Sequence, residues 1–318
     1  MSENPYVFIV GCPRSGTTLL RRLVDAHPQI AITPETQWIP RFFTRRKGLS
    51  PQGLVTPKLI DKLVAHRRFF LLGIERDELV ALLKSRQPIS YADFVGGIFD
   101  LYGRARGKEW VGDKTSGYVR NLRVLHELWP AARFVHIIRD GRDVCLSVMS
   151  WSKADRATGF FQSWDHDPVS TAALWWSCNV HFGREVGQTL EKKKYYEIRY
   201  DLLVANPAEE CAKLCEFLAV PYHDFMPQFH EHRPAVSAEI EADHAWMPVT
   251  SGLRDWRSQM SAVDVQRFEA SAGDLLESLG YERAATSLQP AALQYAREFR
   301  RAFAQDAHSK PWRLPQCW

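Results

Sequence analysis

The stretch that most constrains the fold of this chain is residues 11–18, which read Gly-Cys-Pro-Arg-Ser-Gly-Thr-Thr. The β-branched and aromatic residues at 6–10 come directly before it and predict a buried strand. Apolar residues at helical spacing follow it and predict a helix. A Gly-rich loop between a strand and a helix directs backbone N–H groups and a helix N-terminus at one place, which suits a phosphate group.

This loop differs from the Walker A motif of nucleoside triphosphatases. In that motif a lysine binds the β- and γ-phosphates, and the hydroxyl that follows it binds magnesium. Here Thr17 holds the position of the lysine, and the cation lies earlier, at Arg14. A triphosphate-dependent kinase is therefore a weaker interpretation, and a purely structural loop is the remaining alternative.

The rest of the chain predicts one large α/β domain over residues 1–285. The 318 residues are 45% hydrophobic and 25% charged, which is typical of globular proteins. Further strands are expected at 30–33, 133–138 and 195–199, and helices at 144–150, 171–190, 207–218, 264–279 and 289–304, with another that ends at 128. This alternation predicts a three-layer fold in which helices cover both faces of a parallel sheet. Residues 41–108 are expected to form a mainly helical insertion, and 286–318 a C-terminal helical tail.

Charge and cysteine content set expectations for partners and location. The net charge of +4 is mild, but residues 41–108 hold 14 Lys/Arg against 6 Asp/Glu. This excess of positive charge could attract an acidic substrate, the acceptor of a transferred group. A solvated helix face explains the excess equally well. The six cysteines are scattered through expected strands and helices, as reduced cytosolic thiols are. With no long apolar run and no room for a signal peptide, we expect a cytoplasmic protein with no nucleic-acid partner and no membrane span.

Two groups of residues could suggest a metal site. Cys211 and Cys215 are four residues apart on an expected helix, and His230, His232 and His244 fall in one loop-like segment. Neither group has the spacing of a zinc site. We therefore expect core packing for the cysteines and no metal.

Residues 8–20, Phe-Ile-Val-Gly-Cys-Pro-Arg-Ser-Gly-Thr-Thr-Leu-Leu, resemble the 5′-phosphosulfate loop of sulfotransferases that use 3′-phosphoadenosine 5′-phosphosulfate (PAPS). The likeness is closest to the tyrosylprotein sulfotransferase branch and its bacterial relatives. It covers roughly residues 5–40 and 110–285 and is weak at 41–108. The resemblance implies a P-loop fold and O-sulfation by in-line displacement. PAPS would be the co-substrate and adenosine 3′,5′-bisphosphate the product, without a metal.

The resemblance also implies which residues bind the donor. The loop amides suit the 5′-phosphate, and they belong to Ser15, Gly16, Thr17 and Thr18. Arg14 matches the family's cation on the sulfuryl group. Arg139 and Ser147, at an expected strand end and on the next helix, match the positions that bind the 3′-phosphate. Tyr200 matches a tyrosine near the nucleotide. Arg257 lies where relatives place a loop over it, beside a Trp256 that could stack there.

Catalysis of sulfuryl transfer requires positioning, stabilisation of charge and removal of a proton from the acceptor. Glu35 follows an expected strand and matches the family's catalytic glutamate, so we expect a general base whose pKa is raised near an apolar pocket. A surface or helix-cap glutamate is the alternative, and His27 is a poorer base. Lys114 matches the family lysine on the sulfuryl group. Relatives often have proline where this chain has Ser116.

The favoured hypothesis is a PAPS-dependent sulfotransferase with Glu35 as base and with Arg14 and Lys114 stabilising the transfer. A small-molecule kinase and a non-catalytic nucleotide-binding scaffold are the rival hypotheses. The acceptor is expected to carry a hydroxyl, and a peptide, a sugar, a lipid and a small metabolite all remain open. Dimers are common in the family, so a homodimer is a further option.

Overall fold

The computed structural model describes residues 5–86, 88–154, 158–231, 247–250, 252, 254–284 and 287–309. Within these residues the centre is a five-stranded sheet of order β2-β3-β1-β4-β5, with every pair parallel. The strands are β1 (Val7–Gly11), β2 (Ile30–Thr33), β3 (Trp110–Lys114), β4 (Arg133–Ile138) and β5 (Tyr195–Arg199). The predicted parallel sheet is confirmed.

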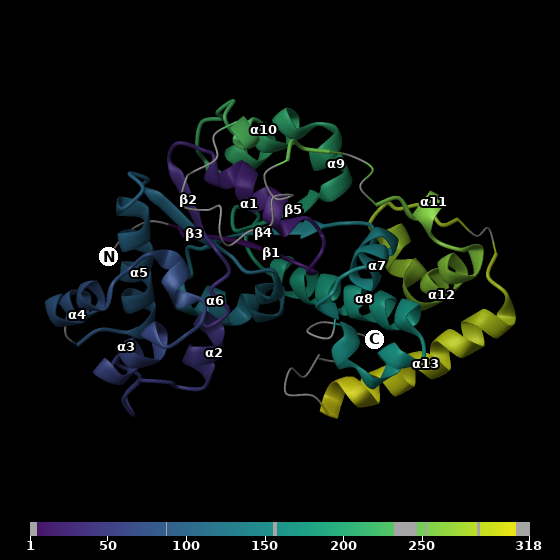
Figure 1. Cartoon of the computed structure of the whole chain (residues 1–318), viewed down its shortest axis with the longest axis horizontal. Coiled ribbons are helices and arrows are strands. Elements are labelled where there is room, and N and C mark those ends of the chain that lie inside the picture. Colours follow the sequence, from purple (N-terminus) through teal and green to yellow (C-terminus); the bar gives the residue numbers. More distant parts are fainter. Residues whose placement is uncertain are drawn as a thin grey trace.

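Helices cover both faces of the sheet, because alternate residues of β1 enter different cores. Phe8 and Val10 pack with α5 (Tyr91–Arg104) and α6 (Leu122–Leu128). Val7 and Ile9 pack with α1 (Thr17–Asp25) and α10 (Pro207–Leu218). Figure 1 shows these two pairs of helices on opposite sides of the sheet. The continuous apolar run of β1 is what burial on both faces requires, and the expected three-layer α/β fold is confirmed.

Strand β3 was not predicted from the sequence. It contains a glycine and ends in two charged residues, Asp113 and Lys114, so it lacks the apolar run of its neighbours. Gly112 is needed because a Cβ there would lie 2.0 Å from the carbonyl oxygen of Val7. Gly112 therefore lets β3 fit between β1 and β2. The same glycine removes a side chain from the pattern by which a strand is recognised in a sequence.

The expected helical insertion lies between β2 and β3. It comprises α2 (Ile39–Thr44), α3 (Pro57–Val64), η1 (Phe69–Leu72), α4 (Arg76–Ser85) and α5. Helix α5 begins where Ser90 Oγ accepts a hydrogen bond from the backbone N–H of Asp93 at 3.1 Å, a typical N-cap. Apolar side chains from α5 belong to the same core as β1, so the insertion packs on the sheet.

The second half of the chain completes the layers. Its helices are η2 (Ser116–Asn121), α7 (Gly141–Met149), α8 (Pro168–Gly187), α9 (Tyr200–Ala205), α11 (Trp256–Gln259), α12 (Ala262–Ser278) and α13 (Pro290–Ser309). Helix α9 was not predicted, and short 3-10 turns, Thr158–Phe160 and Gln162–Asp165, lie between α7 and α8. Helix α13, yellow in Figure 1, runs along α12 and α8.

The structure bears in part on the expected histidine group, the C-terminal tail, metal binding and membrane spans. His232 and His244 lie outside the described residues, as does the tail beyond 309. In the described part of the chain, no group of three or more His, Cys, Asp or Glu is placed to hold a metal. None of the helices described here combines the length and the apolar character needed to cross a membrane.

Candidate active site at the carboxyl end of the sheet

The candidate site lies where β1 and β4 end side by side. From β1 the chain continues through α1 to β2 on one side of the sheet, and from β4 it continues to β5 on the other side. In open α/β sheets, ligands bind in the crevice at the carboxyl ends of two such strands. The Gly-rich loop follows β1 and the turn at Arg139 follows β4, so both border this crevice.

The Gly-rich loop adopts backbone conformations that hold it against the sheet. Gly16 has a φ of 94°, and a Cβ there would lie 2.3 Å from the ring of Tyr200. Arg14 has a φ of 75°, which is rare for a residue with a side chain and is found mainly at functional sites. Since the N-cap of α1 is Gly16, the first amides of the helix have no capping side chain and remain directed at the crevice.

Arg14 and Ser147, which we expected to share the donor, are brought together. The Arg14 Nε donates a hydrogen bond of 3.1 Å to the Oγ of Ser147 on α7. Partial desolvation lowers the pKa of the Arg14 guanidinium, as do the neighbouring guanidinium groups of Arg254 and Arg139. Three arginines that repel one another around one loop indicate a site for an anion.

Arg139 lies at the end of β4 with its guanidinium carbon 4.3 Å from the ring centroid of Tyr200. Its Nη2 is 3.3 Å from the Oδ2 of Asp143, so the guanidinium forms a salt bridge across the turn that begins α7. Because Tyr200 contacts both Arg139 and the position of Gly16, it joins the loop to the turn after β4. Tyr200 therefore lies beside two of the residues that the resemblance assigns to the donor, and its own contact with a nucleotide stays a prediction.

The segment before α11 contributes a cation that sequence reasoning missed. The Arg254 Nη2 donates a hydrogen bond of 2.9 Å to the Oγ of Ser150. Arg257, which was singled out instead, is exposed and lies 4.6 Å from the ring centroid of Trp256. The available signal for Arg254 was its position three residues before Arg257, in the segment that was expected to lie over the nucleotide.

The expectation that Trp256 stacks on a nucleotide does not fit the structure. Its side chain is only 6% exposed. The guanidinium carbon of Arg142 lies 3.6 Å from the centroid of its ring, so protein groups already occupy this surface. Trp256 therefore anchors the start of α11, and Arg254 and Arg257 on either side of it are better placed to contact a ligand.

Glu35 and Lys114 meet at the ends of adjacent strands. Glu35 follows β2, and Lys114 is the last residue of β3. The Lys114 Nζ is 3.1 Å from the Oε1 of Glu35 and 3.4 Å from the Oγ1 of Thr18 in the loop. One buried ammonium group thus contacts both the candidate base and the Gly-rich loop.

The expected upward shift of the Glu35 pKa is wrong. Burial is the largest single influence and would raise the pKa of Glu35, but Lys114, Arg68 and Gln37 together lower it below its ordinary value. The Arg68 Nη2 lies 3.7 Å from Oε2, and the Gln37 Nε2 donates a hydrogen bond of 2.9 Å to the same atom. The carboxylate is therefore ionised at neutral pH and ready to accept a proton.

Ser116, which departs from the family pattern, links the loop to the carboxylate. Its Oγ shares a hydrogen bond of 2.8 Å with the Oγ1 of Thr17 and lies 3.4 Å from the Oε1 of Glu35. A proline at this position has no hydroxyl and would lack both contacts. Serine therefore adds a polar connection that the sequence comparison alone did not suggest.

Asp113 is the buried residue that precedes Lys114 on β3, and the sequence analysis did not assign it a role. Its carboxyl group is fully buried and accepts a hydrogen bond of 2.9 Å from the Oγ1 of Thr33. Burial raises the pKa of Asp113 to about 6, although hydrogen bonds from threonines oppose the shift. This carboxyl group connects the ends of β2 and β3, which carry the two candidate catalytic residues.

The residues present fit a ligand that carries phosphate groups. Among the described residues, the Oγ of Ser15 and the Nε of Arg139 are buried without a hydrogen-bond partner. A buried polar atom left unpaired costs about 1–3 kcal/mol, so partners are expected for both. These atoms come from the loop after β1 and the turn after β4, which are the two sides of the crevice.

Comparison with known proteins agrees with this geometry. The family model described as the sulfotransferase family matches residues 5–224. The chain is 28% identical to a protein-tyrosine sulfotransferase of Drosophila melanogaster over 291 residues, which cover 88% of this chain and 52% of that protein. It is 26% identical to protein-tyrosine sulfotransferase 1 of Homo sapiens over 296 residues, which cover 88% and 70%. The chain thus spans about half the length of the fly relative.

A solved structure shares the fold. The sulfotransferase domain from the Synechococcus PCC 7002 olefin synthase aligns with a TM-score of 0.55 at 20% identity, covering 93% of this chain and 94% of that domain. This similarity concerns the fold alone. Since the family model matches well over half of the residues, the chain belongs to the sulfotransferase family.

Proposed function

We propose that this chain transfers the sulfuryl group of PAPS to an acceptor hydroxyl and releases adenosine 3′,5′-bisphosphate. The observation that carries the proposal is the position of Lys114, whose ammonium group contacts both Glu35 and Thr18 of the phosphate-binding loop. A base for the acceptor and a site for the donor thereby share one cation. This arrangement suits in-line displacement at sulfur, in which the attacking and leaving oxygens lie on opposite sides of the transferred group.

The donor half of the proposal assigns each phosphate to a group of residues. The loop amides and the Ser15 hydroxyl would bind the 5′-phosphate. Arg139 and Ser147 would bind the 3′-phosphate. Two features support this assignment: Arg139 Nε is buried without a partner among the described residues, and Ser147 accepts its hydrogen bond from Arg14 and keeps its own proton for a ligand. Arg14 would stabilise charge on the sulfuryl group and its bridging oxygen.

In the proposed reaction, Glu35 accepts the proton of the acceptor hydroxyl, and Arg14 and Lys114 stabilise the negative charge of the transfer. The low pKa of Glu35 in the free protein depends largely on Lys114. When Lys114 turns toward the anionic sulfuryl group, the carboxylate loses part of this neutralising charge. Its pKa then rises, and Glu35 becomes a stronger base at the time when a base is needed.

The acceptor is proposed to be acidic around its hydroxyl. Around His66 in the insertion lie the cations of Arg41, Arg67, Arg68 and Lys47, which together with burial lower the pKa of the imidazole. Arg68 also lies 3.7 Å from the Glu35 carboxylate, so this positive region borders the base. The names of the relatives specify protein tyrosine, and a tyrosine flanked by acidic residues satisfies both the charge and the need for a hydroxyl.

A thermal-shift experiment without magnesium tests the donor assignment. A ligand at 100 times its dissociation constant adds about 2.7 kcal/mol of stability, which is readily measured. We expect adenosine 3′,5′-bisphosphate to stabilise the protein more than ADP or ATP, and Arg139→Ala to remove the difference. Equal stabilisation by ATP would favour the kinase interpretation, although Thr17 holds the lysine position and its hydroxyl is bonded to Ser116.

A cytoplasmic location is also proposed, on the basis of the cysteines. The five in the described part of the chain, at 12, 145, 178, 211 and 215, are buried and unpaired with one another in disulfides. Such thiols suit a reducing compartment. Fractionation of cells that express the full chain tests this, and recovery in a secretory or periplasmic fraction would contradict it.

A further inference from the structure

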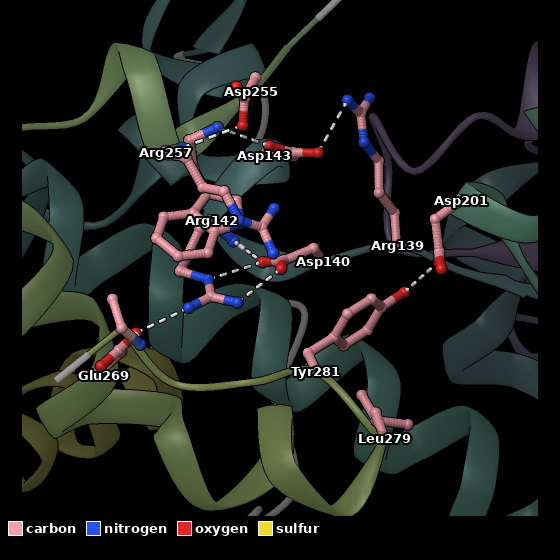
Figure 2. Close-up of polar contacts among 12 residues, drawn as sticks. Arg139, Asp140, Arg142, Asp143, Asp201, Asp255, Arg257, Glu269, Leu279 and Tyr281 are labelled. Carbon is pink, nitrogen blue, oxygen red and sulfur yellow. Dashed lines mark hydrogen bonds and ion pairs between the residues drawn. The ribbon is translucent and has the colours of Figure 1, made fainter. Parts of the chain in front are cut away.

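Asp143 lies between the arginine after β4 and the segment that begins α11. Figure 2 shows its carboxylate with one oxygen toward Arg139 and the other toward the backbone at the start of that helix. The Arg139 Nη2 is 3.3 Å from Oδ2, and the backbone N–H of Trp256 donates to Oδ1 at 3.0 Å. A single carboxylate thus holds two segments that lie more than one hundred residues apart in the chain.

The start of α11 is fixed to the rest of the protein on its other side. The ring of Trp256 lies against Arg142, whose guanidinium binds Asp140 at 2.7 and 3.0 Å and Glu269 of α12 at 2.7 Å. Figure 2 shows the bonds of Arg142 to Asp140 and Glu269 below the Asp143 carboxylate. Arg142 and Glu269 are fully buried, so this anchor is rigid. The Asp143 contact connects this anchor to the Arg139 guanidinium.

The orientation of Arg139 depends on the same carboxylate. The guanidinium lies over the ring of Tyr200, and Asp143 holds its Nη2. The Nε is left buried without a partner in the described structure, on an arginine that borders the Gly-rich loop. Arg254, two residues before Trp256, is close enough to the loop to lower the pKa of Arg14. Both cations that Asp143 positions therefore belong to one anion site.

We propose that Asp143 is a positioning residue that orients Arg139 toward the 3′-phosphate of the donor and couples this contact to the placement of Arg254. The inference rests on the proposed function, because it assumes that the anion at Arg139 is the 3′-phosphate. It adds a residue that itself touches no donor atom. The coupling follows from geometry, since one carboxylate holds Arg139 through Oδ2 and, through Oδ1, the backbone N–H of Trp256, two residues after Arg254.

The test compares two ligands that differ only in the 3′-phosphate, adenosine 3′,5′-bisphosphate and adenosine 5′-monophosphate. Asp143→Asn keeps an oxygen for the Trp256 N–H but loses the charge that holds Arg139. We expect the dissociation constant of the bisphosphate to rise about tenfold and that of the monophosphate to change less than about twofold, within the range of couplings between sites. A merely structural role would weaken both ligands equally.

Asp201→Asn is the matched control. Asp201 also bridges an arginine and a second group at a strand end, binding Arg199 at 2.7 Å and the hydroxyl of Tyr281 at 3.0 Å. Its loss should leave the ratio of the two dissociation constants unchanged. If Asp143→Asn does not fold, Asp143→Ser replaces it, because serine also removes the charge that holds Arg139.

A double-mutant cycle tests the coupling to Arg254. In an Arg254→Ala background, Asp143→Asn should cost less bisphosphate affinity than in the wild type, because one of the two positioned cations is already gone. Strictly additive losses would overturn the coupling. A wild-type ratio retained in Asp143→Asn would overturn the orienting role alone. A wild type with no preference for the bisphosphate would overturn the proposed donor and this inference together.

Discussion

Lys114 and Glu35 form an ion pair of 3.1 Å in which the lysine side chain is 6% exposed and the glutamate 22%. A nearly buried ammonium group needs a strong partner, because desolvation alone lowers its pKa. Glu35 supplies this partner while the site is empty, and an anionic sulfuryl group would supply it when the donor is bound. The pair is therefore best understood as a carboxylate held ionised by a lysine that the proposed donor would draw away, which leaves Glu35 a stronger base.

Glu35→Gln should abolish turnover and spare donor binding. Glutamine keeps the size of the side chain but cannot accept the acceptor's proton, so we expect a loss of about 10²- to 10⁴-fold in kcat. Sulfation of an acidic tyrosine peptide with labelled PAPS measures the rate, and calorimetry with adenosine 3′,5′-bisphosphate measures donor binding. Glu185→Gln, which removes an exposed ion pair with Arg123 of 2.8 Å, is the control. Unchanged turnover in Glu35→Gln would exclude Glu35 as the base.

Asp113→Asn should stabilise the protein at neutral pH. The folded state holds the pKa of Asp113 at about 6, above its ordinary value of 3.8. The folded protein thus binds more protons than the unfolded chain between these values, so wild-type stability falls as pH rises from about 4 to 6. The variant lacks this loss and gains up to about 3 kcal/mol at pH 7, if the amide oxygen keeps the Thr33 hydrogen bond.

Urea unfolding at pH 4, 5, 6 and 7 measures this difference. The gap between Asp113→Asn and the wild type should widen as pH rises and reach a plateau above about pH 6. Asp61→Asn, at a carboxylate whose side chain is 58% exposed, should show no such trend. A gap that stays constant across these pH values would mean that the Asp113 carboxyl is ionised throughout.

The sequence predicted those parts of the fold that depend on local patterns. Strands β1, β2 and β4 are apolar runs because both of their faces are buried, and such runs are recognisable without a structure. Strand β3 was missed because close contact between backbones replaces side-chain burial at Gly112. The strand could not be recognised from its side chains, because its central residue is a glycine and has no side chain.

Most of the residues that form the candidate site could be predicted from the sequence. The direction in which their pKa values shift could not. Arg14 and Lys114 were identified from a family resemblance, and the order of the strands then brings their segments together. The direction of the Glu35 pKa shift was not predictable, because it depends on Arg68 and Lys114, which lie 33 and 79 residues further along the chain. Arg254 was missed for the same reason, since its neighbours are distant in sequence.

Gly16→Ala should weaken binding of the donor, and a variant with similar backbone strain elsewhere in the chain should not. The new Cβ would lie 2.3 Å from the ring of Tyr200, so the loop or the ring must move. Gly53→Ala is the matched control, because Gly53 has a similar φ of 86° and no atom within 4 Å of the added Cβ. Both variants carry a strain of about 1 kcal/mol, and only Gly16→Ala should lose affinity for adenosine 3′,5′-bisphosphate. Equal affinity in both would mean that the loop tolerates displacement.

Arg68→Ala should raise the KM for an acidic acceptor, because Arg68 is a cation of the insertion that lies 3.7 Å from Glu35, the proposed base. We expect an increase of about fivefold to tenfold for a tyrosine peptide with flanking acidic residues, as loss of one charge-assisted contact gives. A neutral peptide should be affected less. Lys58→Ala removes an exposed cation from α3 of the same insertion and controls for net charge. Parallel changes for both peptides would show that the insertion does not select acceptors by charge, and a search among uncharged hydroxyl compounds would then follow.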